Sequence, residues 1–428
     1  MDIFKQKVKT LFQGSFVKNV SMLVGGTAFA QLITIILLPV LTRLYSPEDF
    51  GVLAVYLSFV SLISVVSCLR LEIAIPIPKE DKDALALFVL SLGSVVVITL
   101  LTAVGTTLFF KQIHQATQGK LEGYIWLIPL SVFFSGIYAA LQYWATRHKA
   151  FSLVAKTRLN QAVGGSSTQI GLGYAGLAPL GLLIGQLVSM GAGIIGLSRY
   201  FIKNSSPLLR DINISELKSV FKQYDRFPKY STWEAFANSG AIQIPVILIA
   251  YYAVSAEAGL LMLAMRLLSA PMSLIGGAVA QVYLAEASEK NYEGQLRQFT
   301  HNTVRALAKI GTFPILFAGM AAPFLIPIIF GEQWQRAGIF IAWMSPWFLM
   351  QFVTSPVSMA LHITNNQKIA MLLQFFGLLL RVGGVVVAGL YYKDYVVEVY
   401  AITGLIFYTI YLIVVLSVLN YRSKRINY

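Results

Sequence analysis

The segment that decides the fold is F-V-K-N-V-S-M-L-V-G-G-T-A-F-A-Q-L-I-T-I-I-L-L-P-V-L-T-R-L-Y-S-P-E-D-F-G-V-L-A-V-Y-L-S-F-V-S, residues 16–61. Two apolar runs, 19–41 and 50–68, flank the polar stretch Y-S-P-E-D at 45–49. Pro47 disfavours the α region at Ser46, so we expect this stretch to be a turn that breaks the helix. The segment therefore predicts a hairpin of two long apolar helices.

The same pattern returns about half a chain later. F-V-K at 16–18 is echoed by F-P-K at 227–229, and D-F-G at 49–51 is echoed by E-A-G at 257–259. The offsets of 211 and 208 residues differ by three, about one helical turn. We therefore expect two similar six-helix bundles, 1–210 and 211–428, with the working site between them.

Composition assigns the chain to the membrane proteins. Of the 428 residues 57% are hydrophobic and only 12% are charged, with a mean hydropathy of +0.69, whereas a soluble domain carries about 25% charged residues. The apolar runs are long and continuous, unlike the ~10-residue alternating segments of a β-barrel. An all-α fold with about twelve membrane spans is predicted. The expected spans are 19–41, 50–69, 84–110, 124–145, 153–175, 179–201, 232–252, 257–284, 306–330, 337–361, 368–391 and 396–420.

The basic residues are distributed unequally between the two sides of the predicted membrane. Of the 33 Lys and Arg residues, 25 fall on one side, five on the other and three within or at the edge of spans. By the positive-inside rule, both termini are cytoplasmic. The net charge of +14 is then explained by topology and lipid contact, and nucleic acid is not an expected partner.

Two further features concern the shape of individual helices. Prolines interrupt the apolar runs 306–330 and 337–361. Such prolines are tolerated in a membrane helix when neighbouring groups satisfy the freed carbonyls. The inner loop 202–231 contains I-S-E-L-K-S-V-F-K-Q-Y at 214–224, with apolar residues at helical spacing and charges opposite. This pattern predicts an interfacial amphipathic helix joining the two halves; a solvated linker helix is the alternative.

The residues that enzymes use are scarce. The four histidines, His114, His148, His301 and His362, have no metal-ligand spacing, and Cys68 is the single cysteine. There is no Ser/His/Asp order, H-E-x-x-H motif or Walker motif. We therefore expect a protein that is not an enzyme and needs no cofactor or metal.

Charged residues inside or at the edge of predicted spans are the candidates for substrate binding. Arg266 and Arg381 lie well inside spans, and Arg70 with Glu72 closes the second span. A central arginine costs about 2.5–3.5 kcal/mol on insertion scales, so it should face a cavity or a partner. We expect a cationic cavity for an anionic substrate. A structural ion pair is the alternative for Arg266 and Arg381, and snorkelling or pairing with Glu72 is the alternative for Arg70.

Uncharged polar residues cluster in the first, fifth and seventh spans. They predict a wet path suited to sugar binding, although polar side chains also join helices to one another. The candidates are Gln31, Asn160, Gln161 and Asn238.

The chain resembles the Wzx-type polysaccharide-biosynthesis flippases of the multidrug/oligosaccharidyl-lipid/polysaccharide exporter superfamily. The residues that carry this resemblance are L-T-R-L-Y-S-P-E-D-F-G at 41–51, L-R-L-E-I-A at 69–74, R-F-P at 226–228 and A-M-R-L-L-S-A-P at 264–271. The resemblance implies two six-helix bundles in a V with a pseudo-twofold axis. It also implies alternating access in the bacterial inner membrane, for undecaprenyl pyrophosphate carrying an O-antigen or other surface-polysaccharide repeat unit.

The resemblance further places Arg266 at a central-cavity arginine of related flippases. It suggests coupling to a proton or sodium gradient, for which no deep carboxylate is found in the seventh or eleventh span. The expected partners are the lipid-linked oligosaccharide and the bilayer, with a polysaccharide polymerase and a chain-length regulator as candidates. A lipid II or drug exporter of the same superfamily, and a membrane polymerase or scaffold, are the rival functions.

Overall fold

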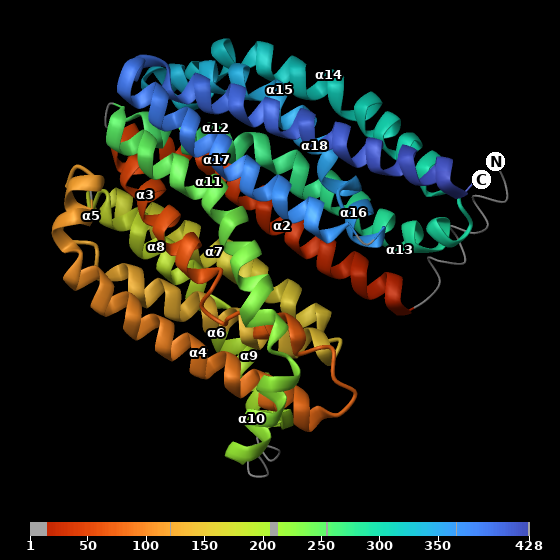
Figure 1. Ribbon diagram of the computed structural model, residues 1–428. Helices are drawn as coiled ribbons and strands as arrows, with labels where there is room; N and C mark the ends of the chain where they lie inside the picture. The colour runs from red at the N-terminus through yellow and green to blue at the C-terminus, as the bar shows by residue number, and fades with distance from the viewer. Residues whose placement is uncertain (1–14, 120, 206–212, 254–255, 365, 427–428) are drawn as a thin grey trace. The chain divides into compact units, whose positions relative to one another are not determined.

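The computed structural model describes residues 15–119, 121–205, 213–253, 256–364 and 366–426, and every regular element in this part of the chain is a helix (Figure 1). The all-α prediction is confirmed. The long helices are α2 (Ser15–Leu44), α3 (Pro47–Ser64), α4 (Asp81–Leu108), α6 (Leu127–Arg147), α7 (Phe151–Tyr174), α8 (Leu180–Ala192), α9 (Ile194–Ser205), α11 (Thr232–Tyr252), α12 (Glu257–Pro271), α13 (Gly277–Tyr292), α14 (Leu296–Phe330), α15 (Gln335–Val357), α17 (Gln367–Tyr391) and α18 (Val396–Ile426).

Shorter elements connect the long ones. They are the helices α5 (Phe110–Ala116), α10 (Ile214–Gln223) and α16 (Ala360–Ile363), the 3₁₀ turns η1 (Leu71–Ala74), η5 (Glu332–Trp334) and η6 (Lys393–Tyr395), and the π-helical turns η3 (Phe227–Ser231) and η4 (Met272–Gly276). Helix thus occupies all twelve predicted spans. By length and composition, ten helices among the described residues qualify as membrane spans. The two others are α7, which is rich in polar residues, and α12, which ends after 15 residues and passes through η4 into α13.

The predicted turn at 45–49 is shorter than expected. The helix does break there, but α3 already begins at Pro47. The Asp49 amide donates a hydrogen bond to Ser46 Oγ at 3.2 Å, and the Ser46 amide donates to Asp49 Oδ2 at 2.9 Å. This reciprocal pair caps the first turn, where a proline costs no hydrogen bond. Pro47 therefore starts the second helix.

The chain divides into two compact units. The first consists of Met1–Leu44, Phe59–His114 and Leu121–Phe236, and the second of Tyr45–Ser58, Gln115–Lys120 and Ala237–Tyr428. These boundaries differ from 1–210 and 211–428, but compactness alone does not define a repeat. The division into two six-helix repeats stays a prediction.

In the first unit α4 packs on α6, and α7 packs on both α2 and α8. The Trp144 ring lies 5.6 Å from Phe88 and 5.4 Å from Phe201, and this aromatic group belongs to the apolar core at one end of the unit. The α7–α8 contact is close because Gly185 faces α7: a Cβ at this glycine would lie 2.8 Å from the Gly165 carbonyl oxygen.

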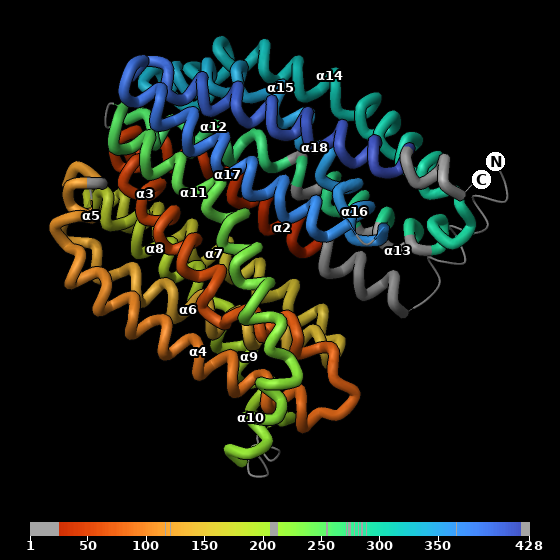
Figure 2. Tube along the Cα trace, in the orientation of Figure 1, coloured from red at the N-terminus to blue at the C-terminus, as the bar shows by residue number. Residues whose placement is uncertain are grey.

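In the second unit the long helices α14, α15 and α18 lie side by side, as Figure 2 traces. The start of α3 packs on α12 and η5. A Cβ at Gly259 would lie 1.9 Å from the Pro47 carbonyl oxygen, and the Phe50 ring stands edge-on to Trp334 at 5.0 Å. The two glycines of the repeated pattern are therefore neighbours, since the same Cβ would lie 2.7 Å from the Gly51 amide nitrogen.

The amphipathic helix predicted in the 202–231 loop is confirmed as α10. Its N-terminus has a capping box formed by Asn213 and Glu216. Lys82 Nζ of α4 lies 2.6 Å from Glu216 Oε1, and this hydrogen bond lowers the pKa of the Glu216 carboxyl. Val220 is buried in the core of the first unit, with Leu217 and Tyr224 packed against it. Ile214 and Phe221 stay exposed, so the membrane-surface location stays a prediction.

Candidate functional site

Arg266 lies in the middle of α12 in the second unit and is half-buried. Within the part of the chain that the structure describes, its guanidinium has neither an ion pair nor a hydrogen bond. The predicted alternative, a structural ion pair with an acid, has no support among these residues. A cation that is left without a partner in a membrane helix can bind an anion.

Arg381 has a different environment. It lies in α17, is 2% exposed, and donates from Nη1 to the Ala241 carbonyl of α11 at 3.4 Å. Its guanidinium carbon lies 4.3 Å from the centre of the Phe407 ring, with Tyr408 and Trp347 also in cation–π range. Aromatic faces thus compensate this charge. The burial favours a structural role in the core of the second unit.

Arg70 belongs to the first unit and stands on a strained backbone. Leu69 and Arg70 both have a positive φ, 51° and 60°, in the left-handed region that non-glycine residues rarely adopt. Arg70 Nη1 lies 3.7 Å from Glu72 Oε1. This is the pairing named above as the alternative to a substrate contact, and the contact of Arg70 with substrate stays a prediction. Glu72 is 6% exposed, and this burial raises the pKa of its carboxyl, against the opposing effect of its own backbone N–H and of Arg70.

The uncharged candidates are divided between the units. Gln31 on α2 and Asn160 and Gln161 on α7 belong to the first unit, whereas Asn238 on α11 belongs to the second and is exposed. A Cβ at Gly26 would lie 2.7 Å from the Ala155 Cβ. Helices α2 and α7 are the first and fifth predicted spans, so they run in the same direction. Gln31 is five residues after Gly26 and Asn160 is five residues after Ala155, so these two residues lie at the same height along the two helices.

The structure reveals a polar group around Tyr143 of α6 that the sequence had not indicated. Arg158 of α7 donates from Nη2 to Gln142 Oε1 at 2.8 Å and lies 5.6 Å from the Tyr138 ring. Helix α6 packs on both η1 and α7, so Tyr143 lies near the charges of Arg70 and Arg158. Arg158 was one of the 25 basic residues counted on the predicted cytoplasmic side, although it lies inside the expected span 153–175. That position in a span was the signal that could have identified it.

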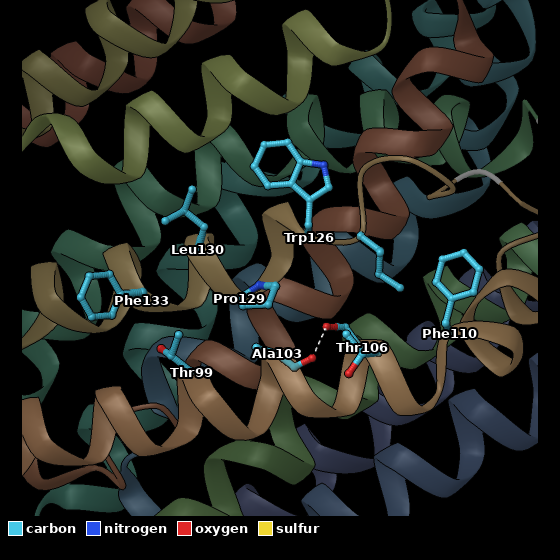
Figure 3. Close-up of a pocket in the computed structure, with 10 residues that line it drawn as sticks. Thr99, Ala103, Thr106, Phe110, Trp126, Pro129, Leu130 and Phe133 are labelled. Atoms are coloured by element: carbon cyan, nitrogen blue, oxygen red, sulfur yellow. Dashed lines mark hydrogen bonds between the residues drawn. The ribbon is translucent and has the colours of Figure 1, made fainter.

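An apolar groove of about 760 Å³ runs between α4 and α6 at the predicted outer ends of these helices. Figure 3 shows Trp126, Leu130 and Phe133 on one side and Thr99, Ala103 and Thr106 on the other. The Thr106 hydroxyl donates to the Ala103 carbonyl of its own helix at 2.9 Å. The residues that line this groove are apolar, apart from three threonines and the indole N–H of Trp126.

A second charged group lies in the second unit, on the predicted outer side. Arg336 of α15 forms an ion pair with Glu257 at the start of α12, lies 3.8 Å from Glu398 and donates to the Asp394 carbonyl at 2.9 Å. The acid of the second repeated pattern thus binds an arginine. Asp49, the acid of the first pattern, instead caps its own helix.

Comparison with known proteins gives the family and the fold. The polysaccharide biosynthesis protein family matches residues 40–338. The succinoglycan biosynthesis transport protein ExoT of Rhizobium meliloti (strain 1021) is 23% identical over 323 residues, which cover 73% of this chain and 61% of that protein. The match therefore spans less than two-thirds of this relative's length.

Among solved structures, the lipid II flippase MurJ in an inward closed conformation has a TM-score of 0.70 at 14% identity, covering 93% of this chain and 90% of that one. An inward-facing MATE-family multidrug resistance transporter has a TM-score of 0.67 at 15% identity, covering 97% of each chain. At such low identities these similarities show a shared fold and leave the substrate open.

Proposed function

Since the chain belongs to the polysaccharide biosynthesis protein family, we propose that it is a flippase of the multidrug/oligosaccharidyl-lipid/polysaccharide exporter superfamily. In this proposal it moves lipid-linked oligosaccharide repeat units across the bacterial inner membrane. The cargo is an oligosaccharide on undecaprenyl pyrophosphate, taken from the cytoplasmic to the outer leaflet by alternating access. Both chain termini are cytoplasmic in this proposal, as the distribution of basic residues predicts.

The observation that carries the proposal is that the Arg266 guanidinium forms no ion pair and no hydrogen bond with any residue that the structure describes. Pyrophosphate is an anion, and a guanidinium binds phosphate oxygens in bidentate fashion. Among the described residues the Arg266 guanidinium has no ion pair or hydrogen bond, whereas Arg381 is enclosed by aromatic rings. We therefore assign the pyrophosphate contact to Arg266, give Arg70 a supporting contact, and give Arg381 the structural role of holding the surrounding helices.

The polar residues Gln31, Asn160, Gln161 and Asn238 are proposed to face the sugar. Gln31 and Asn160 lie at one level of two adjacent helices, where hydroxyl-rich cargo can exchange hydrogen bonds along a path. The prenyl chain remains in the lipid, because its transfer into a polar path is unfavourable. A polysaccharide polymerase and a chain-length regulator remain candidate partners.

The experiment compares Arg266→Ala and Arg266→Lys in a strain that depends on this protein for surface polysaccharide. Arg266→Ala is expected to lower export by at least about tenfold, since a charge-assisted hydrogen bond contributes about 1.5–3 kcal/mol, while the amount of membrane protein stays normal. Arg266→Lys is expected to restore part of the export, because an ammonium keeps the charge but loses the planar fork.

Arg305→Ala is the matched control, because Arg305 is an exposed arginine on α14 of the same unit. Full export by Arg266→Ala at normal protein level would end the assignment of Arg266. Accumulation of lipid II or retention of a drug, instead of loss of surface polysaccharide, would favour the rival exporters. Loss of polymer length with normal transport would favour a polymerase or scaffold.

A further inference from the structure

The polar group around Tyr143 contains two buried atoms that no part of the described chain satisfies. They are Arg70 Nε and Glu72 Oε2. The Arg70–Glu72 approach at 3.7 Å is longer than a hydrogen bond, and the Arg70 side chain is 29% exposed, so a ligand can reach it. Buried polar atoms in folded proteins are nearly always paired, with protein, water or a bound molecule. The Arg70 N–H and the Glu72 oxygen are therefore available for hydrogen bonds to a bound molecule.

The charges around these atoms favour an anion. Arg70, in the segment before η1, and Arg158 of α7 both lie near the Tyr143 hydroxyl. Glu72 contributes the carboxylate of this group. The Arg158 guanidinium is held in place by Gln142 and by the Tyr138 ring. Tyr138 is itself positioned by a 3.0 Å hydrogen bond to Thr157. A guanidinium fixed in this way is suited to bidentate contact with phosphate.

We propose that Arg70, Arg158 and Tyr143 form a pyrophosphate-binding site in the first unit, at its predicted cytoplasmic end, and that Glu72 is a built-in competitor which the ligand displaces from Arg70. The site is additional to Arg266. It deepens the proposed function, on which it rests for the source of the pyrophosphate, namely the lipid-linked cargo at loading.

Displacement couples ligand binding to uptake of a proton. The Glu72 carboxylate and the ligand compete for Arg70. Once the ligand holds Arg70, the buried carboxylate is left beside a second anion and takes a proton from water to become the neutral acid. Burial already raises the pKa of this carboxyl, and an anion bound beside it raises the pKa further. Linkage then requires that the protonated state bind the ligand more tightly, so competition by Glu72 weakens as the pH falls.

Other charged groups near Glu72 have partners of their own. On its own segment the titratable groups are Arg70 and the buried Cys68 thiol. On α4, Asp81 pairs with Arg147 of α6 and Lys82 pairs with Glu216, while Asp83 is half-buried at the helix start. On η3, Lys229 pairs with Asp225, and Tyr230 is exposed. Arg70 is therefore the charge that Glu72 and the ligand share.

The test measures binding of farnesyl diphosphate and of inorganic pyrophosphate to the purified full chain between pH 6 and pH 8. All variants carry Arg266→Ala, which removes the cation of the proposed cargo site. Arg158→Gln is expected to weaken binding about tenfold, the factor that corresponds to one pKa unit of interaction. Arg199→Gln is the matched control, because Arg199 is an exposed arginine on α9 of the same unit and should leave binding unchanged.

The Glu72→Gln variant tests the competitor. It should bind about tenfold more tightly than its Glu72 parent at pH 8, with the difference becoming smaller as the pH is lowered. Comparing the two proteins at each pH cancels the titration of the ligand itself. Tighter binding of farnesyl diphosphate than of inorganic pyrophosphate identifies a lipid-borne ligand, and equal binding identifies the free anion.

Two results would overturn the inference. One is unchanged binding in Arg158→Gln, and the other is a Glu72→Gln protein whose affinity equals that of its parent at every pH. A purely structural Arg70–Glu72 pair gives the second result together with a lower thermal midpoint. Normal pH-dependent binding in vitro, with no effect of the protein on surface polysaccharide in cells, would instead contradict the proposed cargo and leave the site intact.

Discussion

At the scale of single residues, the three arginines predicted within or at the edge of spans have three different environments. Arg266 has no partner among the described residues, Arg381 is surrounded by aromatic rings, and Arg70 stands on a strained backbone beside a buried acid. Position in a predicted span identified all three as unusual, because an arginine in hydrocarbon needs compensation. The nature of that compensation depends on neighbours remote in sequence, such as Phe407 for Arg381. Sequence spacing contains no information about these neighbours.

The residue-scale prediction concerns Arg381. Arg381→Ala removes a large, 98% buried side chain from a cage of three aromatic rings and leaves the Ala241 carbonyl without its donor. Large-to-small changes in a core cost about 2–5 kcal/mol. We expect a clear fall in the thermal midpoint of the purified protein in detergent and less protein in the membrane. Arg305→Ala, at an exposed position of the same unit, should change neither; an unchanged midpoint in Arg381→Ala would refute the structural role.

At the scale of elements, the apolar runs predicted each helix to within a few residues for most of the chain. The exceptions have local causes. Pro47 was taken as part of a turn, but it occupies the first position of α3, where a proline has no hydrogen bond to lose. The prolines within the span 306–330 do not break the helix, as expected, but α14 begins earlier than that span, at Leu296, and continues to Phe330 through three prolines. Neighbouring helices satisfy the freed carbonyls in such cases.

The element-scale prediction concerns the crossing of α12 and the start of α3. Gly259→Ala would place a Cβ 1.9 Å from the Pro47 carbonyl oxygen, and backbone atoms cannot move aside as a flexible side chain can. The two helices must separate, so we expect a lower yield of folded protein and a lower thermal midpoint. Gly277→Ala in α13 is the matched control, since a Cβ there has no neighbour within 4 Å. Equal stability of the two variants would mean that the close crossing does not exist.

This crossing also bears on the predicted repeat. The two glycines of the D-x-G and E-x-G patterns pack against one another, which is the arrangement expected where two equivalent segments meet at a local twofold axis. Their acids have nevertheless diverged, since Asp49 caps a helix and Glu257 binds Arg336. The equivalence of the two halves stays a prediction, and it requires that α3 and α12 superpose with Gly51 on Gly259.

At the scale of the whole molecule, composition and hydropathy were sufficient for the class of protein, and the family match supplied the biological process. The site could be predicted only in part. Arg266 and Arg70 were found because charge is conspicuous in an apolar span. Arg158 was counted with the basic residues of the cytoplasmic side, and Gln142 and Tyr143 were unremarkable until folding brought α6 next to α7 and η1. Contacts between distant segments of this kind cannot be read from one sequence.

The central claim is that this protein moves a lipid-linked oligosaccharide and that Arg266 binds its pyrophosphate. The most direct test reconstitutes the purified chain into vesicles containing an undecaprenyl-pyrophosphate oligosaccharide with a radiolabelled terminal sugar, and adds a glycosidase that cannot cross the membrane. With the wild-type protein, we predict that label from both leaflets becomes accessible over time. With Arg266→Ala, only the label initially in the outer leaflet should be released. Equal release by the wild type, the variant and protein-free vesicles, or full release by Arg266→Ala, would contradict the account.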